Sequence, residues 1–317
     1  MPDLRPVVDR EQVLTALGQY FSAPITSLTP VEGGQVMRTF TFRVGEQDNQ
    51  DYIVRFNHDT MLTSNLPKEI YIAGKLVVAP VPMSPVLYTG RLNELHFAIS
   101  LKVPGQMVES LIEQEVELLM PEIMRILDAI HHIDVSDTQG YGVFDYRGMS
   151  TVSSWQGSLA IIAKEEDERD YFGKWYSLFT DTFLERGLFK DIYWKMRDLL
   201  DFCPTERYLV HGNYSLRNIL ADHGEITAVL DWVDAKYGDF VFDIAGLDFW
   251  YPWLRVRERF QRYYQDQQIN VPAYEQRMLC YQYYIFLSAI RFYARAGDER
   301  AYHWVKQRLL ELQSFQA

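Results

Sequence analysis

Apolar and polar residues alternate along residues 39–44, which is typical of a β-strand because successive side chains of a strand point to opposite faces. Further extended segments are predicted at residues 25–31, 51–56, 86–88 and 97–101. Thr89-Gly90 and Asn93-Glu94 are turn-forming residues, and we predict that both pairs lie in the turn between the last two strands. The first part of the chain is therefore predicted to be a five-stranded sheet with one packed helix, ending near residue 102.

Helical spacing of apolar residues dominates the rest of the chain and is clearest in residues 113–132. The apolar residues of that segment are Val116, Leu119, Met120, Ile123, Ile126, Leu127 and Ile130. Adjacent helical residues diverge by about 100°. His131 and His132 therefore cannot share one metal and are assigned a charge role at the helix end. Other helices are predicted at residues 9–20, 67–76, 155–170, 191–202, 254–267, 273–296 and 299–313.

Polar residues follow two apolar strands in the middle of the chain. Residues 208–210 lead into His211-Gly212-Asn213, with Asn218 five positions later, and the strand at 226–230 ends in Asp231. An Asn in a loop and an Asp after the next strand are the usual metal ligands in magnesium-assisted phosphoryl transfer. Mg²⁺ needs only one or two carboxylates besides phosphate oxygens. Asn218 and Asp231 are therefore predicted metal ligands, and position 213 is predicted to face the accepting hydroxyl.

Asn213 departs from this chemistry, which normally uses Asp at the first position of the loop. An amide oxygen can accept a hydrogen bond from a hydroxyl group, but it cannot take the proton. The sequence therefore predicts that Asn213 occupies the catalytic position and that the catalytic base is impaired.

The stretch from Tyr208 to Trp250 resembles the aminoglycoside phosphotransferase family, and so does the aromatic segment Phe249-Trp250-Tyr251-Pro252-Trp253. The resemblance implies an α+β, bilobal, protein-kinase-like fold. A small β-rich nucleotide-binding lobe is expected at residues 1–102, and a larger, mainly helical catalytic and substrate-binding lobe at residues 103–317. It also implies a phosphotransferase with an alcohol acceptor that uses ATP (or GTP) and Mg²⁺.

The resemblance further assigns residues to the nucleotide. The turn at Gly33-Gly34 would lie over the phosphates, although a plain hairpin turn is an equal reading. Arg55 would hold phosphates where the kinase fold usually has Lys, and Glu69 would pair with Arg55 or simply face solvent. The segment expected to present backbone groups to adenine consists of Ser100, Leu101, Lys102 and Val103.

Four residues outside the nucleotide site receive roles from the same resemblance. His211 is expected to be a packed, hydrogen-bonded structural residue, and Asp243 is expected to brace the catalytic loop. Trp250 and Trp253 are expected to contact the substrate, because aromatic faces accept sugar C–H surfaces and ammonium groups. The alternative for both rings is a place in the hydrophobic core.

Charge narrows the choice of partners. The formal net charge is −12 over 317 residues, which argues against nucleic acid or an anionic membrane surface as a partner. Acidity suits a cationic small molecule, or serves solubility alone. Cys203 and Cys280 show no paired or metal-type spacing, and the N-terminal residues show no apolar signal core. We therefore expect a reduced cytoplasmic protein, and a monomer.

The expected activity is ATP- and Mg²⁺-dependent phosphorylation of an aminoglycoside-like hydroxyl, with a hygromycin B-like acceptor as the best candidate. Two alternatives stay open. One is a kinase for another small alcohol, either choline-like or a macrolide. The other is a nucleotide-binding pseudoenzyme, for which Asn213 is the reason.

Overall fold

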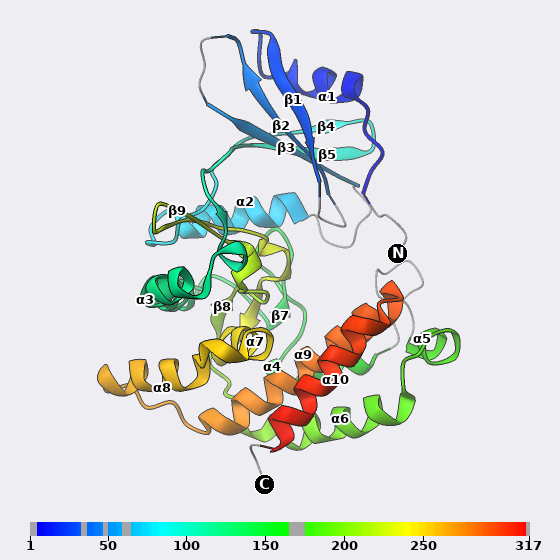
Figure 1. Cartoon of the computed structure of the whole chain (residues 1–317), viewed down its shortest axis with the longest axis vertical. Helices are drawn as coiled ribbons and strands as arrows, with labels where there is room; N and C mark the ends of the chain where they lie inside the picture. The colour runs from blue at the N-terminus through cyan, green and yellow to red at the C-terminus, as the bar shows by residue number, and fades with distance from the viewer. Residues whose placement is uncertain (1–4, 33–36, 47–49, 59–64, 165–174, 315–317) are drawn as a thin grey trace.

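The computed structural model describes residues 5–32, 37–46, 50–58, 65–164 and 175–314. A β-rich N-terminal part lies above a larger helical part in Figure 1. Gly33 and Gly34, and the acidic run at residues 165–170, lie outside the described residues. No described helix has the length and apolar character needed to cross a membrane.

The N-terminal part is an antiparallel five-stranded sheet with the strand order β1-β2-β3-β5-β4. Its strands are β1 (Ile25–Val31), β2 (Arg38–Val44), β3 (Tyr52–His58), β4 (Val86–Leu92) and β5 (Leu95–Leu101). Helix α1 (Arg10–Leu17) begins as predicted at Asp9, whose Oδ1 accepts from the Gln12 N–H at 2.8 Å. Val13 and Leu17 of α1 are buried in the core of this sheet, where alternate strand residues meet them.

The turn between β4 and β5 is shorter than predicted. Thr89 and Gly90 belong to β4, so the prediction that they lie in the turn is wrong. The ladder continues to the pair Leu92↔Leu95, which leaves only Asn93 and Glu94 between the strands. Asn93 takes the left-handed conformation (φ 55°) that a two-residue hairpin turn requires and that Asn tolerates.

Helix α2 (Asn65–Leu76) lies between the sheet and the helical part in Figure 1, where it overlaps β9 (Ile219–Asp222) in the view. Its residues Ile72 and Leu76 belong to the hydrophobic core of the helical part, not to the core of the sheet. Pro67 lies in the first turn of α2, where a missing N–H costs no helical hydrogen bond. α2 therefore packs against the helical part, although in sequence it lies between β3 and β4 of the sheet.

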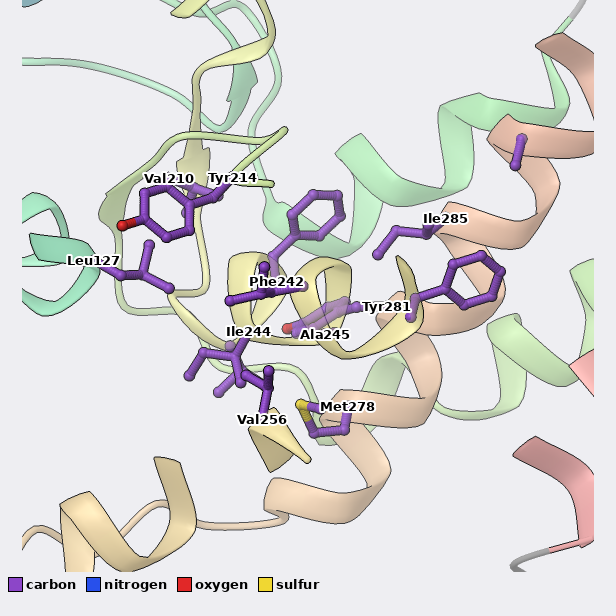
Figure 2. Packing of buried hydrophobic residues seen from close by; sticks show 14 of the residues in the cluster. Leu127, Val210, Tyr214, Phe242, Ile244, Ala245, Val256, Met278, Tyr281 and Ile285 are labelled. Atoms are coloured by element: carbon purple, nitrogen blue, oxygen red, sulfur yellow. The ribbon is translucent and has the colours of Figure 1, made fainter. Parts of the chain in front are cut away.

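The helical part contains two small sheets, ordered β10-β9-β6 and β7-β11-β8. Besides β9, their strands are β6 (Gln106–Met107), β7 (Gly142–Val143), β8 (Tyr208–Val210), β10 (Glu225–Val229) and β11 (Lys236–Gly238). The helices are α3 (Glu113–His131), α4 (Trp155–Ala160), α5 (Trp175–Asp181), α6 (Arg186–Asp198), α7 (Val241–Trp250), α8 (Val256–Asp266), α9 (Tyr274–Ala296) and α10 (Glu299–Ser314). Figure 2 shows side chains of α3, α7 and α9, such as Leu127, Phe242 and Tyr281, filling the space between them.

Two predicted helices differ from those observed. The helix predicted at 155–170 ends at Ala160 and is followed by a 3₁₀ turn at Ile161–Ala163. The indole of Trp175 donates to the carbonyl of Ile162 at 2.6 Å and so provides a hydrogen-bond partner for a carbonyl in the turn that ends this helical segment. The helix predicted at 191–202 begins earlier, in α6, and α5 was not predicted at all.

Candidate active site

The loop after β8 is positioned by a close backbone approach. Gly212 has φ 82°, which favours glycine. A Cβ at this position would lie 2.1 Å from the carbonyl oxygen of Asp234. Gly212 therefore allows the loop with Asn213 to pack directly against the segment that follows Asp231.

Asp243, at the N-terminal end of α7, holds this loop. Its two carboxylate oxygens accept from the backbone N–H groups of His211 and Gly212, both at 2.8 Å. Nε2 of His131 lies 3.1 Å from Asp243 Oδ2. Burial raises the pKa of Asp243, but the hydrogen bonds and positive charge around it outweigh burial and lower its pKa overall. This is the bracing geometry expected for Asp243.

His131 makes a contact that the sequence did not predict. It was expected to serve as a charge at the end of α3; it does lie in the last turn of that helix, but it is buried and contacts Asp243. His132 is the exposed member of the pair, and its Nδ1 lies 2.8 Å from the Asp128 carbonyl oxygen. The contact of His131 joins residues 112 positions apart, so no local pattern could have identified it.

His211 links the loop to the end of β10. Its Nε2 lies 3.0 Å from the Leu230 carbonyl oxygen, and its Nδ1 accepts from the Asn213 N–H at 3.3 Å. A ring that donates through Nε2 and accepts through Nδ1 is a neutral imidazole. Burial lowers its pKa, which agrees with that state. Both ring nitrogens are engaged by backbone groups, so this histidine has a structural place in the loop.

Asn218 and Asp231 come together through the backbone. The Leu230 N–H donates to the Asn218 carbonyl at 2.7 Å, which brings the end of β10 beside the loop. The side-chain Nδ2 of Asn218 donates to the Asn213 carbonyl at 2.9 Å. This bond fixes the amide and leaves its Oδ1 without a hydrogen-bond partner among the described residues.

The carboxylate of Asp231 is electrostatically unusual. The residue is exposed overall, and its carboxylate is close enough to Asp234 and Glu69 to be repelled by them. Desolvation, together with repulsion by Asp234 and Glu69, raises its pKa to about 6. It makes no salt bridge within the described part of the chain. A carboxylate crowded by like charges fits the oxygen-donor chemistry of a hard cation, and the backbone bond from Leu230 brings the loop with Asn218 to the same end of β10.

Arg55 on β3 and Glu69 on α2 form the predicted ion pair, which is confirmed. Arg55 Nη1 lies 3.0 Å and 2.9 Å from the two carboxylate oxygens of Glu69. Both side chains are largely shielded, with 21% and 12% exposure, so the pair is more than a loose surface contact. The reading of Glu69 as a solvated helix residue is wrong.

Part of the backbone that is expected to contact adenine already makes hydrogen bonds within the protein. The Leu101 N–H donates to Pro85 at 3.2 Å, its carbonyl accepts from Ser84 Oγ at 2.6 Å, and Lys102 N–H donates to Asp51 at 2.9 Å. Ser100 is buried within β5. The Lys102 carbonyl and the Val103 N–H and carbonyl make no hydrogen bond with the described residues.

Aromatic residues surround the end of α7. Trp250 is half-buried and stacks on Trp304 of α10, with centroids 5.9 Å apart and planes inclined by 4°. Trp253 is 41% exposed. Tyr251 between them donates to Glu109 at 2.9 Å.

Glu109 extends this group of side chains to the catalytic loop. Arg217, the residue before Asn218, donates through Nε to both Glu109 carboxylate oxygens at 2.8 Å. The aromatic segment is thereby joined to the loop through one carboxylate. No pattern in the sequence pointed to Glu109, Arg217 or Trp304.

Comparison with known proteins identifies the family of this chain. The model of a family described as "Phosphotransferase enzyme family" matches residues 27–280. Hygromycin-B 4-O-kinase of Escherichia coli is 30% identical over 245 residues, which is 76% of this chain and 67% of that protein.

Similarity to solved structures concerns the fold. The structure of aminoglycoside phosphotransferase APH(4)-Ia has a TM-score of 0.76 at 25% identity, covering 96% of this chain and 98% of that one. A thermostable mutant in ternary complex with AMP-PNP and hygromycin B has a TM-score of 0.78 at 24% identity, covering 95% and 97%. The expected kinase-like α+β fold is confirmed. The chain belongs to the phosphotransferase enzyme family.

Proposed function

We propose that this protein transfers the γ-phosphoryl group of ATP, with Mg²⁺, to a hydroxyl of an aminoglycoside resembling hygromycin B. The observation that carries the proposal is the 30% identity to Hygromycin-B 4-O-kinase, together with the metal-type arrangement of Asn218 and Asp231. The acidic net charge of −12 supports a cationic acceptor.

The nucleotide would bind between β3, α2 and the segment after β5. Arg55 would contact the phosphates, oriented by its two short contacts with Glu69. The Lys102 carbonyl and the Val103 groups are the best candidates for adenine, because Leu101 already uses its own backbone groups and Ser100 is buried. Gly33 and Gly34 stay candidates for the phosphates on the sequence alone.

Asn218 Oδ1 and the Asp231 carboxylate would hold the metal ion. Bound Mg²⁺ would neutralise charge on the phosphate oxygens. The hydrogen bond to the Asn213 carbonyl fixes the orientation of the Asn218 amide. This supports the role, because a ligand whose orientation is set in advance loses less entropy on binding. His211 and Asp243 would keep the loop in place through their backbone contacts.

Asn213 would orient the accepting hydroxyl without taking its proton. Phosphoryl transfer depends mainly on positioning and charge stabilisation, so residual activity is compatible with an amide at this position. The same residue supports the second candidate function, a nucleotide-binding pseudoenzyme. A kinase for a choline-like or macrolide alcohol is the remaining alternative.

Trp250 and Trp253 would contribute to the acceptor site, and Trp304 would support Trp250 through their parallel stack. Trp253 is 41% exposed, so its ring is available to contact a sugar or an ammonium group. We also propose a cytoplasmic monomer, since ATP is available there and both cysteines are free thiols in the core.

The function is tested by ATP-coupled turnover with hygromycin B, kanamycin, choline and a macrolide, alongside calorimetry of MgATP binding. We expect slow turnover with hygromycin B or a related aminoglycoside. Turnover with choline or the macrolide alone would replace the substrate class. MgATP binding with no turnover of any acceptor would favour the pseudoenzyme, and absence of nucleotide binding would overturn the proposal.

A further inference from the structure

Lys68 of α2 is a buried charged residue that reaches across the molecule. It is 1% exposed, and its Nζ donates to the carbonyls of Val233 and Ala235 at 2.8 Å and 2.6 Å. The ammonium also lies 4.5 Å from the ring centroid of Phe144. The carbonyls that it binds come two and four residues after Asp231, in the segment between β10 and β11.

This segment needs support from outside. Asp231 has φ 59° and ψ 68°, a left-handed conformation that costs a non-glycine residue roughly 1–2 kcal/mol. Such backbone persists when surrounding contacts over-determine it. From the loop side, Leu230 is held by Asn218 and His211. From the opposite side, Lys68 holds the carbonyls that follow.

The neighbour of Lys68 on α2 is Glu69, which holds Arg55. Two consecutive residues of one helix therefore contact the two sides of the nucleotide site, one through Arg55 and one through the segment that carries Asp231. Ile72 and Leu76, further along α2, are buried in the core of the helical part, so the helix is a rigid support for both contacts.

We propose that Lys68 is a positioning residue that sets the Asp231 carboxylate for metal binding and couples this segment to Arg55 through α2. The inference rests on the proposed function, because it takes Asp231 as the metal ligand. It adds a role that the motif spacing of the sequence does not contain. Burial is the main cause that lowers the pKa of Lys68, to about 7, and the nearby Lys236 lowers it further, whereas Asp234 raises it. The two carbonyl acceptors and the aromatic face favour the ammonium form.

The test uses Lys68→Met in the full-length protein, because Met keeps much of the side-chain volume and removes all three N–H donors. ADP and ATP affinities are measured by calorimetry with Mg²⁺ and with EDTA. We expect the affinity gain that Mg²⁺ gives wild type to fall about tenfold or more. The metal-free affinities, which depend on Arg55 and the segment after β5, should stay within about twofold.

Lys75→Met is the matched control, since Lys75 lies on the same helix and pairs with Asp137 at the surface. It should keep the full Mg²⁺ effect. If Lys68→Met retains the wild-type Mg²⁺ effect, the positioning role is wrong. If it weakens binding equally with and without Mg²⁺, Lys68 serves only general stability, and the inference is again overturned.

A second measurement covers the case in which Lys68→Met does not fold. Hydrogen–deuterium exchange of wild type is compared for the ADP and the Mg²⁺–ADP complexes. Coupling predicts that Mg²⁺ protects peptides of α2 together with residues 231–238; protection of 231–238 alone would refute it. If Mg²⁺ changes neither nucleotide affinity nor exchange in wild type, the metal assignment of the proposed function fails instead.

Discussion

Asn213→Asp is the most informative single change in this protein. The Asn213 backbone is engaged by His211 and Asn218, but its side-chain amide has no hydrogen-bond partner in the described part of the chain. The residue is only partly buried, so a carboxylate there breaks no existing contact and stays hydrated. We expect the stability of the variant to lie within about 0.5 kcal/mol of wild type.

The expected gain in rate is large by comparison. A positioned general base contributes typically 10²–10⁴-fold, which is about 3–5 kcal/mol of activation free energy. Because the loop is already held by Asp243 through two 2.8 Å bonds, the new carboxylate should occupy the catalytic position without rearrangement. A carboxylate also attracts a cationic acceptor, so KM for an aminoglycoside should fall while KM for ATP changes little.

The assay is ATP-coupled turnover of wild type, Asn213→Asp and Asn213→Ala with the same acceptors. Asn213→Ala controls for loss of the amide and should lie at or below wild type. Retained MgATP binding with no rate gain for Asn213→Asp on any acceptor would refute the reasoning that position 213 lacks only a base. A gain confined to one acceptor class would identify the substrate.

Three further predictions concern other parts of the site. Asp231→Ala should abolish Mg²⁺-dependent nucleotide binding in calorimetry. In wild type this dependence should weaken about tenfold per pH unit below the pKa of about 6 and level off above pH 7, because protons compete with the metal for a carboxylate whose pKa is raised. His131→Ala should lower the free energy of unfolding in urea by about 1–3 kcal/mol, since it removes a partner of a buried carboxylate. Trp250→Ala and Trp253→Ala should each raise the dissociation constant of the aminoglycoside and leave that of ATP nearly unchanged.

A variant at another position serves as the control for each of these predictions. Glu225→Ala removes an exposed carboxylate at the start of β10 and should keep Mg²⁺ dependence; equal loss in both variants would contradict a specific role for Asp231. His132→Ala should change stability by less than about 0.5 kcal/mol, because this histidine is exposed. Trp194→Ala is the control for the loss of a surface indole, because Trp194 lies on α6 and is 61% exposed. Lower stability with unaltered aminoglycoside affinity would show that Trp250 and Trp253 only pack.

The local pattern of apolar and polar residues by itself determined most of the helices and strands. The helix predicted at 113–132 is α3, and the strand predicted at 25–31 is β1, because periodicity states directly which face of an element is buried. The spacing of Asn213, Asn218 and Asp231 likewise lies within one short stretch of chain. The ion pair between Arg55 and Glu69 spans only 14 positions, and the kinase-like resemblance was enough to predict it.

The tertiary structure alone decided the contacts that hold the site. Lys68 meets Val233 across 165 positions, and His131 meets Asp243 across 112. The thiols of Cys203 and Cys280, which showed no pairing in sequence, lie 3.8 Å apart in the core. A periodic pattern shows that a face is buried but not what covers it, because the partner depends on how distant elements pack. The residues predicted to bind ligands could therefore be named from the chain, whereas those that position them became visible only in the fold.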